Sequence, residues 1–162
     1  MRKTRLIAAL ALALASNLEG SQSSPGAKET GDIAVVVNAA NPVNELSVPE
    51  LRKMLTGDRR FWQGNVQVKL VLCAPGLRER DQVLASLLKI KNKEFAGLWR
   101  AKVFRGEAAE EPLSVTSAST AQRSLLAMPG GITFVMVKDP SQQLKVLKIE
   151  GKLPGEPGYV LK

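Results

Sequence analysis

Short apolar runs rich in β-branched residues constrain the fold more than any other feature of this chain. Residues 33–37 read Ile-Ala-Val-Val-Val without a polar interruption. A strand with one solvated face would alternate polar and apolar residues, so this run is typical of a strand covered on both faces. Further strands are predicted over residues 66–72, 132–137 and 144–149.

Helical segments alternate with these strands. Ser47 and Glu50 form a predicted capping box, with Leu46 and Leu51 at the positions of a hydrophobic staple and Gly57 as the stop. Three further helices are expected: one over residues 82–90, one that begins at a capping Asn92 and ends at Gly106, and one that begins at a second capping box, Ser119 to Gln122. This alternation predicts an α/β fold with a largely parallel or mixed sheet.

The first 31 residues are expected to lie outside the folded domain. A basic start is followed by ten apolar residues and an Ala-Leu-Ala cleavage pattern, which predicts a secretory signal peptide over residues 1–15. Residues 16–31 have the composition of a flexible leader, and residues 32–162 are the predicted domain. Removal of the signal peptide takes away three basic residues and no acidic one, so the net charge falls from +8 to +5.

Composition excludes several classes of function. The chain has no histidine, so histidine-dependent triads and histidine-rich metal sites are impossible. A single cysteine, Cys73, permits no internal disulfide and no zinc site, and it is expected to be a small buried hydrophobe at a strand end. Basic residues are scattered and aromatics few, which is not typical of nucleic-acid binding. We therefore expect a protein that is not an enzyme, with no catalytic residue, cofactor or metal.

Four stretches resemble the substrate-binding proteins of phosphate ABC importers, within the type II periplasmic-binding-protein superfamily. Gly31–Trp62 is similar to the crossover strand, Asn-Pro loop and helix of that family, and Leu70–Asp81 stands where the family has its Gly-Ser-Gly-Thr anion loop. Met128–Val137 and Val146–Leu161 are similar to a later strand and the closing segment. The resemblance implies one lobe of a two-lobed binding protein: the second lobe, with a mixed sheet of about four or five strands and helices on its faces.

The anion loop departs from the family pattern at the positions that would hold phosphate. Aligned on Gly76, the serine of the family is replaced by Leu77, the second glycine by Arg78 and the threonine by Glu79. Leucine offers no donor, and arginine lacks the backbone freedom of glycine. A carboxylate at Glu79 would use the helix field that favours a bound anion, so it is expected to act as a built-in substitute for that anion.

Four residues are candidate ligand contacts. Gly76, Arg78 and Arg80 belong to the loop, and arginine binds phosphate or carboxylate through a forked pair of hydrogen bonds. Asn38 follows the first strand. The alternatives are solvated surface arginines at 78 and 80, and turn formation by Asn38 and Asn41.

Two functions remain open at this point. The first is an exported, periplasmic or secreted solute-binding domain related to phosphate import, with an oxyanion such as phosphate as ligand and an ABC permease or a second protein chain as partner; phosphate binding itself is doubtful because the loop is rewritten. The second is an interaction or scaffold protein that uses the exposed cleft face. Neither function involves nucleic acid, or stable membrane insertion once the signal peptide is removed.

Overall fold

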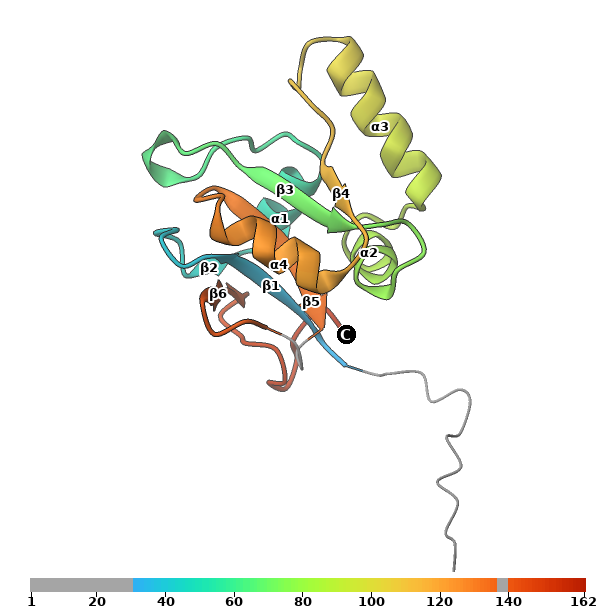
Figure 1. Cartoon of the computed structure of the whole chain (residues 1–162). Helices are drawn as coiled ribbons and strands as arrows, with labels where there is room; N and C mark the ends of the chain where they lie inside the picture. The colour runs from blue at the N-terminus through green and yellow to red at the C-terminus, as the bar shows by residue number, and fades with distance from the viewer. Residues whose placement is uncertain (1–30, 137–139) are drawn as a thin grey trace, which may run out of the picture.

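The computed structural model describes residues 31–136 and 140–162. At its centre is a five-stranded sheet with strand order β4-β3-β5-β1-β6, shown in Figure 1. The strands are β1 (Ile33–Asn38), β3 (Lys69–Cys73), β4 (Leu113–Val115), β5 (Gly131–Met136) and β6 (Leu144–Val146). β3 runs parallel to β4 and β5, whereas β1 runs antiparallel to β5 and β6. The predicted α/β fold with a mixed sheet is confirmed.

Helices cover both faces of this sheet. They are α1 (Val48–Leu55), α2 (Arg78–Val83), which continues into a π-helical turn η2 (Leu84–Leu88), α3 (Asn92–Phe104) and α4 (Ala118–Leu126). The apolar residues of α1, α2, η2 and α3 share one core with alternate strand residues, while those of α4 share a second core with the other strand residues. Figure 1 shows α4 in front of the sheet and α1 behind it.

β1 explains why its sequence has no polar residue before Asn38. Val35 and Val37 point into the core beneath α1, and Ala34 and Val36 point into the core beneath α4. All four side chains are fully buried. The closing segment completes the cover, because the Ile33 N–H donates to the Leu161 carbonyl at 2.7 Å and the Tyr159 hydroxyl donates to the Ile33 carbonyl at 2.7 Å.

The first helix begins and ends as its sequence predicts. The Ser47 Oγ accepts from the Glu50 N–H at 3.3 Å, and the Glu50 carboxylate accepts from the Ser47 N–H at 2.9 Å. The two staple residues, Leu46 and Leu51, are buried in the same core. Gly57 follows the helix with φ +75°, and Trp99 packs so closely on it that a Cβ would lie 2.8 Å from the ring.

Several predicted boundaries were wrong. The helix expected from Gln82 begins four residues earlier, at Arg78. Asn92 is the first helical residue of α3 and not its cap, because the Glu94 carboxylate accepts from the N–H of Lys91. The second capping box is absent: Ser117 caps α4 and accepts from the Thr120 N–H at 3.1 Å.

Two short strand pairs escaped prediction. β4 has three residues, and β2 (Glu45–Leu46) pairs in parallel with β7 (Lys148–Ile149) in a separate two-stranded sheet. The strand expected over residues 144–149 is therefore two strands in two sheets, β6 and β7. The third strand, β3, starts at Lys69 rather than at 66; a 3₁₀ turn, η1 (Gln63–Asn65), precedes it, and Gln67 forms an isolated antiparallel bridge with Phe61.

The predicted signal peptide and the predicted leader up to residue 30 lie outside the described residues, as does Val137. Among the residues that the structure describes, no helix has the length and apolar character needed to cross a membrane.

Candidate functional site

The connections that follow β3 and β4 leave the sheet toward opposite faces. β3 leads into α2, which shares the core of α1 and α3, whereas β4 leads into α4 on the other face. In open α/β sheets, ligands bind at the carboxyl ends of strands where neighbouring connections diverge in this way. The Ala74 N–H donates to the Val115 carbonyl at 2.7 Å, which joins the two strand ends at this point. The loops that follow these two strand ends are the candidate site.

The loop after β3 keeps the shape of an anion loop. Pro75 and Gly76 are exposed, and Gly76 has φ +90°, a conformation that favours glycine. Leu77 occupies the N-cap position of α2 and provides no side-chain hydrogen bond to the helix start. The loop therefore presents backbone N–H groups but no short hydroxyl donor.

A carboxylate of the chain itself already fills part of this loop. The Gly76 N–H donates to Asp81 Oδ1 at 3.2 Å, and the Asn92 Nδ2 donates to the same oxygen at 2.5 Å. The expectation that Glu79 would substitute for the anion was wrong, because the carboxylate in that position is the one of Asp81. The Glu79 carboxylate accepts no hydrogen bond within residues 31–136 and 140–162, whereas the Asp81 carboxylate accepts from the Gly76 N–H.

Arg80 is built into the protein interior. Its side chain is only 7% exposed; its Nε donates to Asn92 Oδ1 at 2.7 Å and its Nη1 to the Cys73 carbonyl at 3.3 Å. The guanidinium lies 5.4 Å from the centre of the Phe95 ring. Burial lowers the pKa of Arg80, opposed by the charge of Asp81. The alternative of a solvated surface arginine is wrong at this position.

Arg78 reaches from the start of α2 to the start of β1. Its Nε donates to Gln82 Oε1 at 3.0 Å, and its Nη2 donates to the Gly31 carbonyl at 3.2 Å. Arg78 Nη1 and Gln82 Nε2 are buried atoms that have no hydrogen-bond partner among residues 31–136 and 140–162. A buried donor without an acceptor lowers the stability of the fold, and these two donors belong to the helix that follows the candidate site. Arg78 is thus partly buried rather than solvated.

Asn38 lies at the opposite end of the sheet. β1 is antiparallel to β5 and β3 is parallel to it, so the carboxyl end of β1 and the loop after β3 are at opposite edges. The Asn38 Nδ2 donates to the carbonyls of Leu125 and Leu126 at 2.7 and 3.3 Å, and its Oδ1 accepts from the Ala40 N–H at 2.9 Å. The structure therefore does not bring Asn38 together with the three loop candidates.

Turn formation by the two asparagines is confirmed. Asn38 Oδ1 closes a turn onto Ala40, and Asn41 Oδ1 accepts from the Val43 N–H at 2.9 Å. Asn38 in addition satisfies the last carbonyls of α4, which no sequence pattern indicated because the two segments are 87 positions apart.

Two further polar residues lie at the candidate site, and the sequence did not indicate either of them as part of it. Thr116 is exposed directly after β4, and Asn92 links Arg80 to Asp81. Thr116 was missed because a three-residue strand gives no periodic signal. The sequence predicts a helix cap at Asn92, since asparagine before an apolar helix usually has that role.

Cys73 is buried at the end of β3, as predicted. It is 1% exposed, and burial raises the pKa of its thiol to about 11. Among the described residues, no three His, Cys, Asp or Glu side chains lie close enough together to hold a metal ion.

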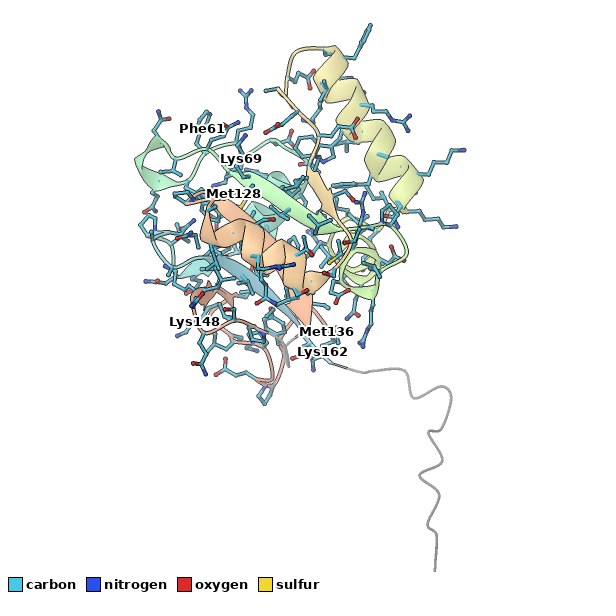
Figure 2. The ribbon with its side chains drawn as sticks, in the orientation of Figure 1. Phe61, Lys69, Met128, Met136, Lys148 and Lys162 are labelled. Carbon is cyan, nitrogen blue, oxygen red and sulfur yellow. The ribbon has the colours of Figure 1, made fainter. Side chains whose placement is uncertain are left out.

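A groove of about 360 Å³ lies at the other end of β3. Its apolar lining includes Met54, Leu70 and Trp99, and the segment Ala108–Leu113 forms one wall. Lys69 on its rim forms an ion pair with Glu110. Figure 2 shows Lys69 and Met128 there, far from Met136 and Lys162 at the end where β1 begins.

Comparisons with known proteins find the fold but no close relative. No protein-family model matches the sequence, and no curated protein matches it. An ABC-type phosphate transport receptor from Vibrio cholerae is similar, with 18% identity, a TM-score of 0.62, and coverage of 76% of this chain and 48% of the receptor. PstS from Borrelia burgdorferi is similar at 13% identity and TM-score 0.62, with 76% and 49% covered.

A third similar structure, from Clostridium perfringens, contains bound phosphate and is assigned to the substrate-binding proteins of phosphate ABC transporters. It has 14% identity and a TM-score of 0.61, with 75% of this chain and 46% of that chain covered. The chain thus spans about half the length of the solved structures that it matches. The predicted resemblance to one lobe of these binding proteins is confirmed at the level of the fold.

Proposed function

We propose that this chain is an exported, solute-binding-like domain related to phosphate import, whose loop no longer holds phosphate as its structural relatives do. One observation carries the proposal: the Gly76 N–H, which an anion would use, donates to the Asp81 carboxylate. Leu77 adds no donor and Glu79 adds a second negative charge at the same helix start. A doubly charged anion would meet repulsion from both carboxylates.

The most favourable place for a ligand acceptor is beside Arg78. Its Nη1 and the Nε2 of Gln82 are buried donors without partners, and both gain a hydrogen bond if a ligand oxygen enters between them. A single carboxylate or a weakly bound oxyanion suits two donors better than phosphate, which needs a larger set. Gly76 contributes the loop conformation, and Arg80 supports the loop from inside through Asn92.

Export and the absence of enzymatic activity are parts of the same proposal. The basic and apolar start of the chain supports a cleaved signal peptide over residues 1–15 and a periplasmic or secreted location. The fold is that of binding proteins, and the chain lacks the histidine on which most general-base chemistry near neutral pH depends.

Isothermal titration calorimetry of residues 16–162 with phosphate, sulfate and small carboxylates tests this proposal. At low ionic strength we expect no micromolar phosphate binding, and weak binding of a carboxylate that Arg78→Ala abolishes. Arg123→Ala, at an exposed position on α4, is the matched control and should change nothing. Micromolar phosphate binding would contradict the rewritten loop, and heat with none of the anions would contradict the solute-binding function.

The second candidate is an interaction protein that uses the same edge of the sheet. It is favoured by the exposure of Pro75, Gly76 and Thr116 together with the half-length match to two-lobed proteins. A permease or a second chain whose backbone carbonyl accepts a hydrogen bond from Arg78 would satisfy the same donors. This function would be selected by two results together: no anion binds, and partner capture is lost in Arg78→Ala but not in Arg123→Ala.

A further inference from the structure

Helix α3 packs on the core along one side, where Leu98 and Val103 are partly buried beside two buried aromatic residues, and it exposes the opposite side. Of its thirteen residues, only Phe95 and Trp99 are buried, and Trp99 Nε1 donates to the Leu55 carbonyl at 3.0 Å. Figure 1 shows α3 on the outside of the molecule, next to β4. A solvated outer face is ordinary for a surface helix, so its composition decides whether it has a role.

One line along this outer face ends in an exposed aromatic ring. Lys93, Gly97, Arg100 and Phe104 are all exposed and follow one another at spacings of three or four residues, which places them on the same side of the helix. Phe104 is 93% exposed. The next most exposed large apolar side chain among the described residues is Phe61, at 47%.

The cations around this line are not neutralised by neighbours. Lys89, Lys91, Lys93 and Arg100 are exposed, and none of them forms an ion pair with a residue that the structure describes. The Arg100 Nε donates to a backbone carbonyl, that of Ala96, at 3.2 Å.

Two acidic residues lie close to the cations, and both are engaged elsewhere. The Glu94 carboxylate accepts from the Lys91 N–H at 2.8 Å, and Glu107 pairs with Arg105 at 2.5 Å. The Glu94 carboxylate keeps its negative charge in this hydrogen bond, but residues 89–104 hold five basic residues and one acidic residue, a net charge of +4, with the exposed Phe104 ring at the end.

We propose that this outward face of α3 binds the surface of a bilayer that contains anionic phospholipid, with Phe104 inserted among the acyl chains. Lysine and arginine near an anionic leaflet are each attracted by its surface potential, and an aromatic ring gains free energy by leaving water at the interface. Gly97 has no side chain at the middle of the line, which lets the helix lie close to a flat surface.

A bilayer fits this face better than a folded partner does. A protein partner would need a pocket shaped for a single projecting ring, whereas a membrane accepts the ring without a preformed complement. Charge complementarity with phosphate headgroups is supplied by Lys93 and Arg100 on α3 and by Lys89 and Lys91 just before it, none of which forms an ion pair with a described residue. The protein would lie on the bilayer surface without crossing it, and the contact uses a different surface from the candidate site at Gly76 and Arg78.

Vesicle co-sedimentation of the full chain tests the proposal. The vesicles are phosphatidylcholine alone and an equal mixture of phosphatidylcholine and phosphatidylglycerol. Binding is expected to be much stronger to the anionic mixture than to phosphatidylcholine alone. Phe104→Ala should lower the partition coefficient about tenfold or more, since a buried phenylalanine side chain is worth that much. Each charge removed in Lys93→Gln and Arg100→Gln should lower it about fivefold.

Matched controls separate this face from the rest of the chain. Phe61→Ala removes an exposed phenylalanine from a different loop, and Lys148→Gln removes an exposed lysine from β7; both should bind as the unaltered chain does. Because every variant keeps residues 1–30, any affinity of that segment for lipid is common to all of them. Equal losses in Phe104→Ala and Phe61→Ala, or no binding to anionic vesicles, would overturn the proposal.

A fluorescence measurement tests insertion independently. Phe104→Trp places an exposed indole at the end of α3, while the native Trp62 and Trp99 are buried. Lipids brominated in their acyl chains should quench the fluorescence of Phe104→Trp in anionic vesicles and leave that of the unaltered chain nearly unchanged. Equal quenching of the two proteins would exclude insertion at residue 104.

Discussion

Position 130 requires glycine because of packing and not because of its backbone conformation. Its carbonyl accepts from the Trp62 Nε1 at 2.9 Å and from the Lys69 N–H at 2.9 Å. A Cβ at this position would overlap the carbonyl oxygen of Gln67 and lie 3.0 Å from its carbonyl carbon. The chain that leads into β5 is thus pressed against the chain that leads into β3.

Gly130→Ala should lower the free energy of unfolding by about 3 kcal/mol, because a backbone segment must move to admit the methyl group. Urea unfolding followed by circular dichroism measures this change. Gly97→Ala is the control, since a Cβ at Gly97 on the outside of α3 meets no atom within 4 Å. That variant should be stabilised by up to about 1 kcal/mol through helix propensity. An unaffected Gly130→Ala would show that the Gln67 segment yields without cost.

Thr133 on β5 carries a buried hydroxyl that has no hydrogen-bond partner in the described part of the chain. It is fully buried beneath α4, and its Oγ1 makes no hydrogen bond. Thr133→Val keeps the shape and removes the unsatisfied oxygen, so it should raise the free energy of unfolding by about 1 kcal/mol. Thr116→Val, at an exposed position, should be close to neutral. A destabilised Thr133→Val would mean that the hydroxyl is hydrogen-bonded in solution.

At the scale of elements, the capping box makes the stability of α1 depend on pH. Hydrogen bonds from the Ser47 N–H and Ser47 hydroxyl, with the charge of Arg59, hold the pKa of Glu50 below its ordinary value of 4.5. A carboxylate whose pKa is lowered by folding stabilises the fold above its unfolded pKa. That contribution disappears as pH falls through the folded pKa.

Glu50→Gln should therefore cost a few tenths to about 1 kcal/mol at pH 7, and the difference from the unaltered chain should shrink as pH falls below about 4.5. The effect is modest because the Glu50 side chain is 44% exposed. Urea unfolding at a series of pH values measures it. Ser47→Ala should lower stability by about 1 kcal/mol at pH 7 and remove only part of the pH dependence, because the backbone N–H of residue 47, the largest cause of the lowered pKa of Glu50, is still present. A difference that stays constant down to acid pH would contradict the charge-based account.

Long elements with strong local signals were predictable from the sequence, and elements made by distant partners were not. β1, α1 and β5 contain continuous apolar runs or a complete cap, so their positions follow from neighbouring residues. β2 and β4 have two and three residues, and they exist only because β7 and β3 lie beside them. The early start of α2 at Arg78 depends on Asp81 and Asn92, which come from two different helices.

The candidate site was predictable in part for the same reason. The sequence indicated the loop at Gly76, because a glycine turn stands there between a predicted strand and a predicted helix. The separation of Asn38 from that loop depends on the direction of β1, which pairs antiparallel with β5 although the other connections suggest parallel strands. The roles of Arg78 and Arg80 depend on what each side chain reaches, Gly31 in one case and Phe95 in the other. No local pattern contains that information.

On the scale of the whole molecule, the chain is one α/β lobe with two regions of different chemistry, and a separate contact is proposed for each. The edge at Gly76 and Arg78 combines an internal carboxylate with two unpartnered donors. The outer face of α3 carries unpaired cations and Phe104. A binding function at the edge and a membrane contact at α3 are thus independent, and variants in one region should leave the other unchanged.

The central claim is that the Asp81 carboxylate occupies the place of an anion in the loop after β3. The most direct test is a phosphate titration of ¹⁵N-labelled protein that follows the backbone amide signals of Gly76 and Leu77 by NMR. We predict that both signals stay in place at phosphate concentrations well above those that saturate a micromolar site, because the Gly76 N–H is already bonded to Asp81. Saturable shifts of these two amides at micromolar phosphate would contradict that claim and show that the loop still binds phosphate.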